Sequence, residues 1–152
     1  MTMSWTVPLV DPNDPGAPVV DRRRLWESLL SKAEEPTGYV PAITECRVVE
    51  RYDDGGFLRE AIRNGEKLVQ RVRPEPERRI VFEHIGDPEV ASITNIIGTG
   101  ADGGTTFTIE TAFTEAGAAR AVRDGEFLRA TAEYFTGTIA SIVRVLRTMA
   151  VG

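Results

Sequence analysis

Cysteine and histidine are almost missing from this sequence, which contains one of each, Cys46 and His84. A single cysteine excludes an intrachain disulfide, so we expect a reducing compartment, the cytoplasm. One thiol and one imidazole cannot assemble an ordinary zinc site, and no loop has the ligand spacing of an EF-hand. We therefore predict no metal site, although a site for Mg²⁺ or Ca²⁺ made of carboxylates alone stays open.

The sequence also lacks a long apolar run and an excess of basic residues. No segment approaches the about 20 apolar residues of a membrane-spanning helix, and Met1–Val10 lacks the basic start and apolar run of a signal peptide. The formal net charge of −5 repels phosphate backbones, and the basic run Arg22-Arg23-Arg24 is too short to reverse that repulsion. These absences argue against a membrane or a nucleic acid as the partner.

The composition is that of a globular protein, because 41% of the 152 residues are apolar and 27% are charged. This length suits one domain over residues 1–152 that buries a core or encloses a cavity. The sequence does not decide between a monomer and a homodimer.

Hydrophobic periodicity predicts the order of the elements. Ser4–Val10 alternates as a strand, and Asp21 can cap a helix from about Arg22 to Glu35. From Thr44 onward the period becomes two, and one long helix is expected from about Ala118 to Met149, in regular register after Gly125. The predicted strands between these helices are Thr44–Tyr52, Phe57–Arg63, Glu66–Arg73, Arg78–Ile85, Ala91–Ile97 and Thr105–Thr114.

This order predicts an α+β helix-grip fold, in which a curved antiparallel sheet of about seven strands surrounds the long C-terminal helix, with short helices between strands one and two. A meander alone would leave its inner face wet, so the terminal helix must cover it. A sheet that curls around one helix without being filled by it leaves a cavity between them.

The element order resembles the START-like (SRPBCC) superfamily, which includes the pollen-allergen and polyketide-cyclase folds. Three runs resemble its AtaL-like branch: Tyr39–Cys46, Leu58–Glu60 and Ile93–Ile96. The resemblance implies binding of a small hydrophobic or aromatic, polyketide-like molecule. In part of the superfamily it also implies cyclisation or dehydration of that molecule.

Two familiar motifs are excluded. Gly98–Gly103 matches the pattern G-x-G-x-x-G, but the residues after it alternate as another strand, so no helix N-terminus is available for a pyrophosphate. No serine lies in a G-x-S-x-G elbow. We therefore expect no cofactor.

Strand parity identifies polar residues on the inner face of the sheet. In Thr105–Thr114 the apolar odd positions, including Phe107, face inward. If the preceding loop pairs residues of like parity, Asn95 also faces inward, either as a ligand contact or as a structural amide bonded to backbone or water.

Two turns set the register of the middle strands. The Asn64-Gly65 turn and a two-residue turn at Glu75-Pro76 would place Ile80 opposite Arg71 and His84 opposite Lys67. One face, assigned inward, then carries Glu60, Arg71, Phe82 and His84.

Three of these residues are the candidate catalytic groups. Arg71 could stabilise an oxyanion, while Glu60 or His84 could transfer a proton. Alternatively, Glu60 and Arg71 neutralise each other and His84 is a packing residue. The candidate ligand contacts are Asn95, Phe82 and Phe107 from the sheet, with Thr131, Tyr134, Phe135 and Thr138 from the terminal helix, where the threonines could instead bond the preceding turn.

Two functions are open at this point. In the first, the domain is a cofactor-independent cyclase, dehydratase or isomerase of secondary metabolism. In the second, the same cavity stores, carries or senses its ligand without changing it. A third, weaker alternative is an interaction module that works through the open edges of the sheet.

Overall fold

Seven antiparallel strands form one sheet in the order β1-β7-β6-β5-β4-β3-β2, so the strands from β2 to β7 pair consecutively and β1 pairs with β7. The computed structural model describes residues 1–10, 13, 16 and 19–149. The strands are β1 (Thr2–Pro8), β2 (Ile43–Arg51), β3 (Phe57–Arg63), β4 (Glu66–Glu75), β5 (Arg79–His84), β6 (Val90–Thr99) and β7 (Thr105–Phe113). The helices are α1 (Arg22–Glu34), η1 (Pro36–Gly38, a 3₁₀ turn), α2 (Glu115–Arg123) and α3 (Gly125–Met149).

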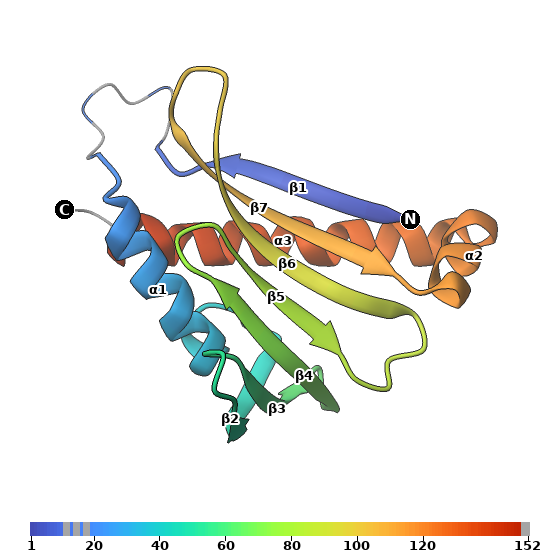
Figure 1. The fold of residues 1–152 in the computed structure, drawn as a ribbon. Helices are drawn as coiled ribbons and strands as arrows, with labels where there is room; N and C mark the ends of the chain where they lie inside the picture. Colours follow the sequence, from blue (N-terminus) through green and yellow to red (C-terminus); the bar gives the residue numbers. More distant parts are fainter. Residues whose placement is uncertain (11–12, 14–15, 17–18, 150–152) are drawn as a thin grey trace.

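The sheet curls around α3, which runs along its inner face (Figure 1). The buried side chains of α3 recur at helical spacing, as Phe135, Ile139, Ile142 and Leu146 show. They share one core with the inward side chains of the strands, and the Trp5 ring of β1 stacks on Phe135 with the ring centroids 4.8 Å apart. This arrangement confirms the predicted helix-grip fold. Among the described residues, no helix is long and apolar enough to cross a membrane.

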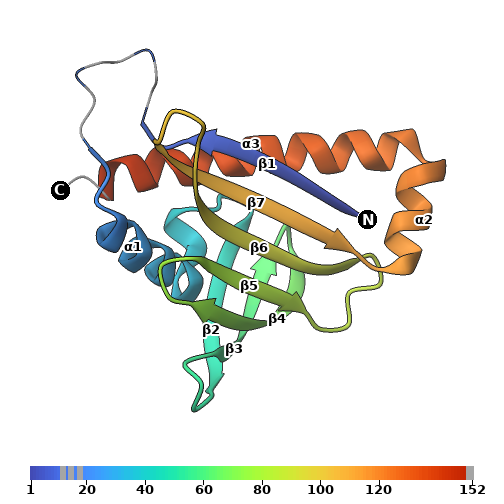
Figure 2. The same cartoon turned by 45° about the horizontal axis from the view of Figure 1, so that its top comes forward.

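Helix α1 packs against the C-terminal half of α3 and closes that end of the groove (Figure 2). The Asp21 carboxylate accepts hydrogen bonds from the amides of Arg23 and Arg24 at 2.9 and 3.3 Å, as the cap prediction requires. The buried face of the helix contains Leu25, Leu29 and Ala33. It also contains the polar residues Ser28 and Lys32.

The single helix predicted from Ala118 onward is wrong, because the chain forms two helices that meet at Asp124 (Figure 2). The Asp124 carboxylate accepts hydrogen bonds from the amides of Glu126 and Phe127, both at 3.1 Å, and so caps a new helix. Gly117 fixes the position of α2, since a Cβ atom there would lie 2.0 Å from the backbone oxygen of Glu89. Helix α2 therefore packs against the segment that leads into β6.

The β3–β4 hairpin has the register that its turn predicts. Asn64 and Gly65 adopt φ angles of 51° and 80°, as a two-residue hairpin turn of type I′ requires. Glu60 lies opposite Val69, and Leu58 lies opposite Arg71. The β6–β7 connection is also a hairpin, so the glycine-rich motif holds no helix N-terminus.

The predicted β4–β5 turn is wrong. Glu75 pairs with Arg79 across a three-residue loop, in which Glu77 has a φ of 58°. Ile80 consequently lies opposite Pro74 and not Arg71, and His84 lies opposite Gln70 and not Lys67. An odd shift in register inverts the faces of β3 and β4 relative to β5. The inner face of the sheet therefore carries Arg59 and Gln70, and Glu60 and Arg71 lie on its outer face.

Candidate ligand-binding site

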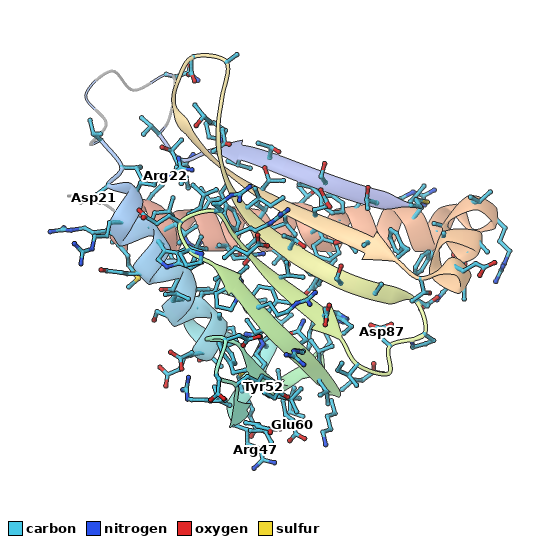
Figure 3. All side chains as sticks on the ribbon, in the orientation of Figure 1. Asp21, Arg22, Arg47, Tyr52, Glu60 and Asp87 are labelled. Atoms are coloured by element: carbon cyan, nitrogen blue, oxygen red, sulfur yellow. The ribbon has the colours of Figure 1, made fainter. Side chains whose placement is uncertain are left out.

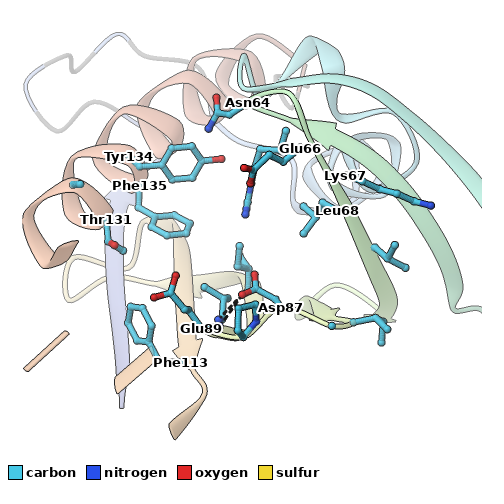
Figure 4. Close-up of a pocket in the computed structure, with 18 of the residues that line it drawn as sticks. Asn64, Glu66, Lys67, Leu68, Asp87, Glu89, Phe113, Thr131, Tyr134 and Phe135 are labelled. Carbon is cyan, nitrogen blue, oxygen red and sulfur yellow. Dashed lines mark hydrogen bonds between the residues drawn. The ribbon is translucent and has the colours of Figure 1, made fainter. Parts of the chain in front are cut away.

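An open cavity of about 580 Å³ lies between the β3–β4 hairpin, the β5–β6 loop and the N-terminal half of α3 (Figure 4). Its volume is typical of small-molecule sites. Leu68, Phe113 and Phe135 contribute apolar wall. The charged side chains of the lining have both signs: Arg63, Glu66, Lys67, Asp87 and Glu89, of which Glu89 is paired with Arg120. We call this space the outer cavity.

A second cavity of about 40 Å³ lies deeper, between the sheet, α1 and α3. We call it the inner cavity. Arg63, Leu68, Ile93, Tyr134 and Phe135 line both cavities, so these side chains form the partition between them. Tyr134 and Phe135 project from α3 into the space between helix and sheet (Figure 4). A ligand in the outer cavity therefore reaches the inner cavity only past these side chains.

Lys32 lies at the inner cavity and is almost completely buried. Its Nζ donates to the amide oxygen of Asn95, which is 2% exposed, over 2.7 Å. Burial is the main cause that lowers the pKa of Lys32 to about 7, and the charge of Arg59 lowers it further. Asn95 therefore faces inward, as predicted, and its oxygen accepts from the protein's own amine.

Arg59 is the second buried cation. Its Nε donates to Gln70 Oε1 over 2.8 Å and its Nη1 donates to the backbone oxygen of Ala33 over 2.7 Å. Burial lowers the pKa of Arg59 to about 10, so the guanidinium stays charged at neutral pH. The Phe82 ring lies beside both cations, with its centroid 4.9 Å from Lys32 Nζ and 4.6 Å from Arg59 Cζ.

A chain of hydrogen bonds leads from Arg59 to the mouth of the outer cavity. Gln70 Nε2 lies 2.8 Å from His84 Nε2, and His84 Nδ1 lies 3.0 Å from a carboxylate oxygen of Asp87. Burial lowers the pKa of His84 below its ordinary value even though the bond to Asp87 raises it. The neutral ring thus donates from Nδ1 to Asp87 and accepts at Nε2 from Gln70, which orients every proton in the chain.

Asp87 ends this chain at the cavity mouth. Its second carboxylate oxygen accepts from the amides of Glu89 and Val90 at 2.9 and 3.0 Å. Although its partial burial opposes ionisation, these amides and His84 lower the pKa of Asp87. The charge of the buried guanidinium is therefore linked, through Gln70 and His84, to a carboxylate at the surface.

Two of the three predicted catalytic residues do not face the cavity. Glu60 bonds Arg47 at 2.9 Å and Lys67 at 3.2 Å on the outer face of the sheet, and these two bonds lower the pKa of Glu60 (Figure 3). Arg71 lies 3.7 Å from Asp54 and stacks over the Tyr52 ring. Because the longer β4–β5 loop shifts the register by an odd number of residues, the inward placement of Glu60 and Arg71 is wrong.

The remaining predicted residues lie inside the grip at different depths. His84 is buried on the inner face, but it lines neither cavity, and both of its nitrogens are bonded within the protein. Thr131 lines the outer cavity and donates to the Phe127 carbonyl, so it bonds the preceding turn as well. Phe107 is fully buried away from both cavities. The predicted contacts that line the inner cavity are Phe82, Asn95, Tyr134, Phe135 and Thr138.

Lys32, Arg59 and Gln70 are not among the site residues predicted from the sequence. A signal for Lys32 was present, because it lies seven residues after Leu25 and three after Leu29 on the apolar stripe of α1. No comparable signal marks Arg59, since both faces of β3 contain apolar and charged residues. Among the described residues, no cluster of three or more His, Cys, Asp or Glu side chains could hold a metal ion.

Comparison with known proteins identifies relatives of the chain. A family model described as AtaL, acetylaranotin biosynthesis cluster protein L, matches residues 3–152. No curated protein sequence matches the chain significantly.

Several solved structures share the fold at low sequence identity. The di-domain ARO/CYC StfQ from the steffimycin biosynthetic pathway superposes with a TM-score of 0.68 at 11% identity, over 98% of this chain and 50% of that protein. The Zhui aromatase/cyclase from Streptomyces sp. R1128 superposes with a TM-score of 0.64 at 15% identity, over 99% and 93% of the two chains. Ara h 8.0201 gives a TM-score of 0.59 at 15% identity, over 97% and 98%. The chain thus spans half the length of the di-domain proteins that it resembles.

Proposed function

Since the chain belongs to the AtaL family, we propose that it is one ligand-binding domain for a small, largely apolar, polyketide-like molecule whose carbonyl, enolate or phenolate oxygen points toward Lys32 and Arg59. The apolar part of the molecule would occupy the outer cavity. The names of two structural neighbours, an ARO/CYC protein of the steffimycin biosynthetic pathway and an aromatase/cyclase, support this ligand class.

One observation carries the proposal. Lys32, Arg59 and Arg63 line the inner cavity, and none of the described residues that line it is an aspartate or a glutamate. Burying a cation without an anion beside it is costly. A ligand oxygen with negative charge would supply the missing partner, so the site favours an anionic head over a neutral one.

The same geometry supports chemistry without a cofactor. Cyclisation, dehydration and isomerisation of a polyketide-like compound all pass through enolates, whose oxygen the two cations would stabilise. The chain of hydrogen bonds through Gln70 and His84 holds the Arg59 guanidinium in one orientation. Such fixed donors need no rearrangement as charge develops on the ligand.

The non-catalytic alternative is favoured by the bonding of His84. Both ring nitrogens are engaged within the protein, so the imidazole offers the ligand neither a free lone pair nor a free proton. In a carrier or sensor the cations would hold the ligand oxygen without a proton transfer.

Binding of a matched pair of ligands tests the proposal. At about pH 6, where Lys32 carries its proton, nitro-substituted 2-naphthols acidic enough to be ionised should bind about 10- to 100-fold more tightly than their methyl ethers, a difference expected for a hydrogen-bonded buried charge. Lys32→Met should remove most of that preference and leave the affinity for the ether unchanged. Arg73→Met removes an exposed cation on the outer face of the sheet that lines neither cavity, so it is the matched control and should alter neither affinity.

Equal affinities for the phenolate and the ether in the native protein would contradict the proposal. Product formation from diketide and triketide test compounds then separates the two functions. Turnover that falls in Lys32→Met or Arg59→Met supports the enzyme, whereas binding without turnover supports the carrier.

A further inference from the structure

The inner cavity contains an unusual amine. Only two of the 18 basic residues are lysines, and the other 16 are arginines. Lys67 is exposed and lies 3.2 Å from Glu60. Lys32, in contrast, is buried, and its Nζ is bonded to a neutral amide oxygen instead of a carboxylate.

Three features of its surroundings favour the uncharged form of this amine. The side chain is withdrawn from water, the Arg59 guanidinium repels a second positive charge, and no described residue at the inner cavity is a carboxylate that would stabilise an ammonium. An amine that is desolvated beside another cation is the arrangement that makes a lysine nucleophilic at neutral pH. An arginine at position 32 could not serve in this way, because its guanidinium stays protonated.

We propose that Lys32 forms a Schiff base with the carbonyl group of an aldehyde, a ketone or a β-dicarbonyl compound bound in the two cavities. This inference rests on the proposed function, because the ligand must direct its carbonyl carbon to the inner cavity. It assigns the site a covalent step that anion binding alone does not include.

The step balances without a further reactant. The nitrogen lone pair of Lys32 forms a bond to the carbonyl carbon, and the π electrons of the carbonyl move to its oxygen. The two hydrogens of the amine then leave with that oxygen as one molecule of water, and a C=N bond replaces the C=O bond. The imine nitrogen then takes up one proton from the solvent, and the resulting iminium is an electron sink that labilises a bond at the neighbouring carbon.

Other residues in the inner cavity have supporting roles. Asn95 is a positioning residue, because its amide oxygen holds Nζ at 2.7 Å in one direction. Arg59 can stabilise the oxygen on which negative charge collects during the addition. The remaining titratable side chains that line this cavity are Arg63 and Tyr134, which belong to the partition and which a ligand must displace on entry.

The native protein provides its own comparison, because the other lysine of this sequence is Lys67. Acetylacetone, a small β-diketone, converts an uncharged lysine to a stable enaminone, which intact-mass measurement detects as a gain of one diketone less one water. At about pH 8, peptide mapping should place the adduct on Lys32, with a rate about tenfold or more above that of Lys67. The rate at Lys32 should reach half its plateau near pH 7, where its pKa lies.

Lys32→Arg keeps a cation and removes the nucleophile, so it should retain naphtholate binding and lose the adduct. If this variant does not fold, the ratio of labelling between the two lysines in the native protein still decides the question. Labelling of Lys67 at a rate equal to or above that of Lys32, with naphtholate bound normally, would overturn the Schiff base and leave the binding function standing. Failure to bind naphtholate would instead overturn the binding function itself.

Discussion

Lys32 and Asn95 share a short hydrogen bond at a depth where neither side chain reaches water. The bond satisfies the amide oxygen, but an ammonium at this position has lost its hydration without gaining a counter-ion. The charged form of Lys32 therefore destabilises the folded protein at the place where a ligand would be bound. A cost of this kind appears in the stability of the protein as well as in its chemistry.

Replacing Lys32 with Met should make stability less dependent on pH. Between pH 7 and about 10.5 the unfolded chain binds a proton at Lys32 that the folded chain does not, so the native protein gains stability as the pH rises. The stability of the variant relative to the native protein should thus fall by about 3–5 kcal/mol across this window. Urea unfolding at several pH values measures it, with Lys67→Met as the control. If the difference in unfolding free energy between the native protein and Lys32→Met did not change with pH, the lowered pKa of Lys32 would be contradicted.

Gln70 connects Arg59 to His84 in the chain of hydrogen bonds, and its removal should lower the stability of the fold. Gln70→Leu leaves Arg59 Nε and His84 Nε2 buried without the partners they have now. Because each unsatisfied group costs about 1–3 kcal/mol, we expect the variant to lose about 2–5 kcal/mol of stability. Arg73→Leu, on the exposed face of the same strand, should cost less than about 1 kcal/mol. An equal loss of stability in the two variants, measured by thermal unfolding, would show that the hydrogen bonds of Gln70 do not stabilise the fold.

At the scale of elements, replacing each of two glycines in the C-terminal helices with alanine should change the stability in opposite directions. Gly117→Ala places a methyl group 2.0 Å from the Glu89 carbonyl, so α2 must move and stability should fall by about 1–3 kcal/mol. Gly137→Ala, in the exposed middle of α3 with no atom within 4 Å of the added methyl group, should gain about 0.5–1 kcal/mol from helix propensity. Differential scanning calorimetry of both variants checks the pair. A gain in both would mean that α2 is not held against the start of β6.

The elements themselves could be predicted from the sequence, because their signals are local. Asn64-Gly65 has one favoured geometry, and Asp21 caps its helix whatever lies elsewhere in the chain. The faces of β3 and β4 relative to β5 could not be predicted, because they depend on where the β4–β5 loop begins and how many residues it contains. The predicted loop was Glu75-Pro76, whereas the observed loop is the three residues after Glu75, and this odd shift of three positions in the pairing places Arg59 and Gln70 on the inner face instead of Glu60 and Arg71.

At the scale of the whole molecule, Phe135 connects the core to the cavities. Its ring stacks on Trp5, meets Tyr134 edge to face at 5.0 Å, and belongs to the partition. Phe135→Ala should therefore merge the outer and inner cavities, at a cost of about 3–5 kcal/mol. Larger aromatic ligands should bind to this variant more tightly than to the native protein.

Titration with an environment-sensitive apolar dye, at one dye per chain, measures this change in ligand size. Val122→Ala, at an exposed position on α2, is the control and should alter neither stability nor dye binding. A native protein that binds no such dye would contradict the cavity as a ligand site.

The chain of hydrogen bonds that ends at Asp87 would couple the binding of a ligand's two ends. Asp87 lies at the cavity mouth, and the guanidinium at the other end of the chain lies at the inner cavity. A ligand that binds the Asp87 carboxylate would change its hydrogen bond to His84, and the bonds through Gln70 would pass that change to the Arg59 guanidinium. The binding free energy of a ligand that fills both cavities would then differ from the sum of the binding free energies measured for its two halves.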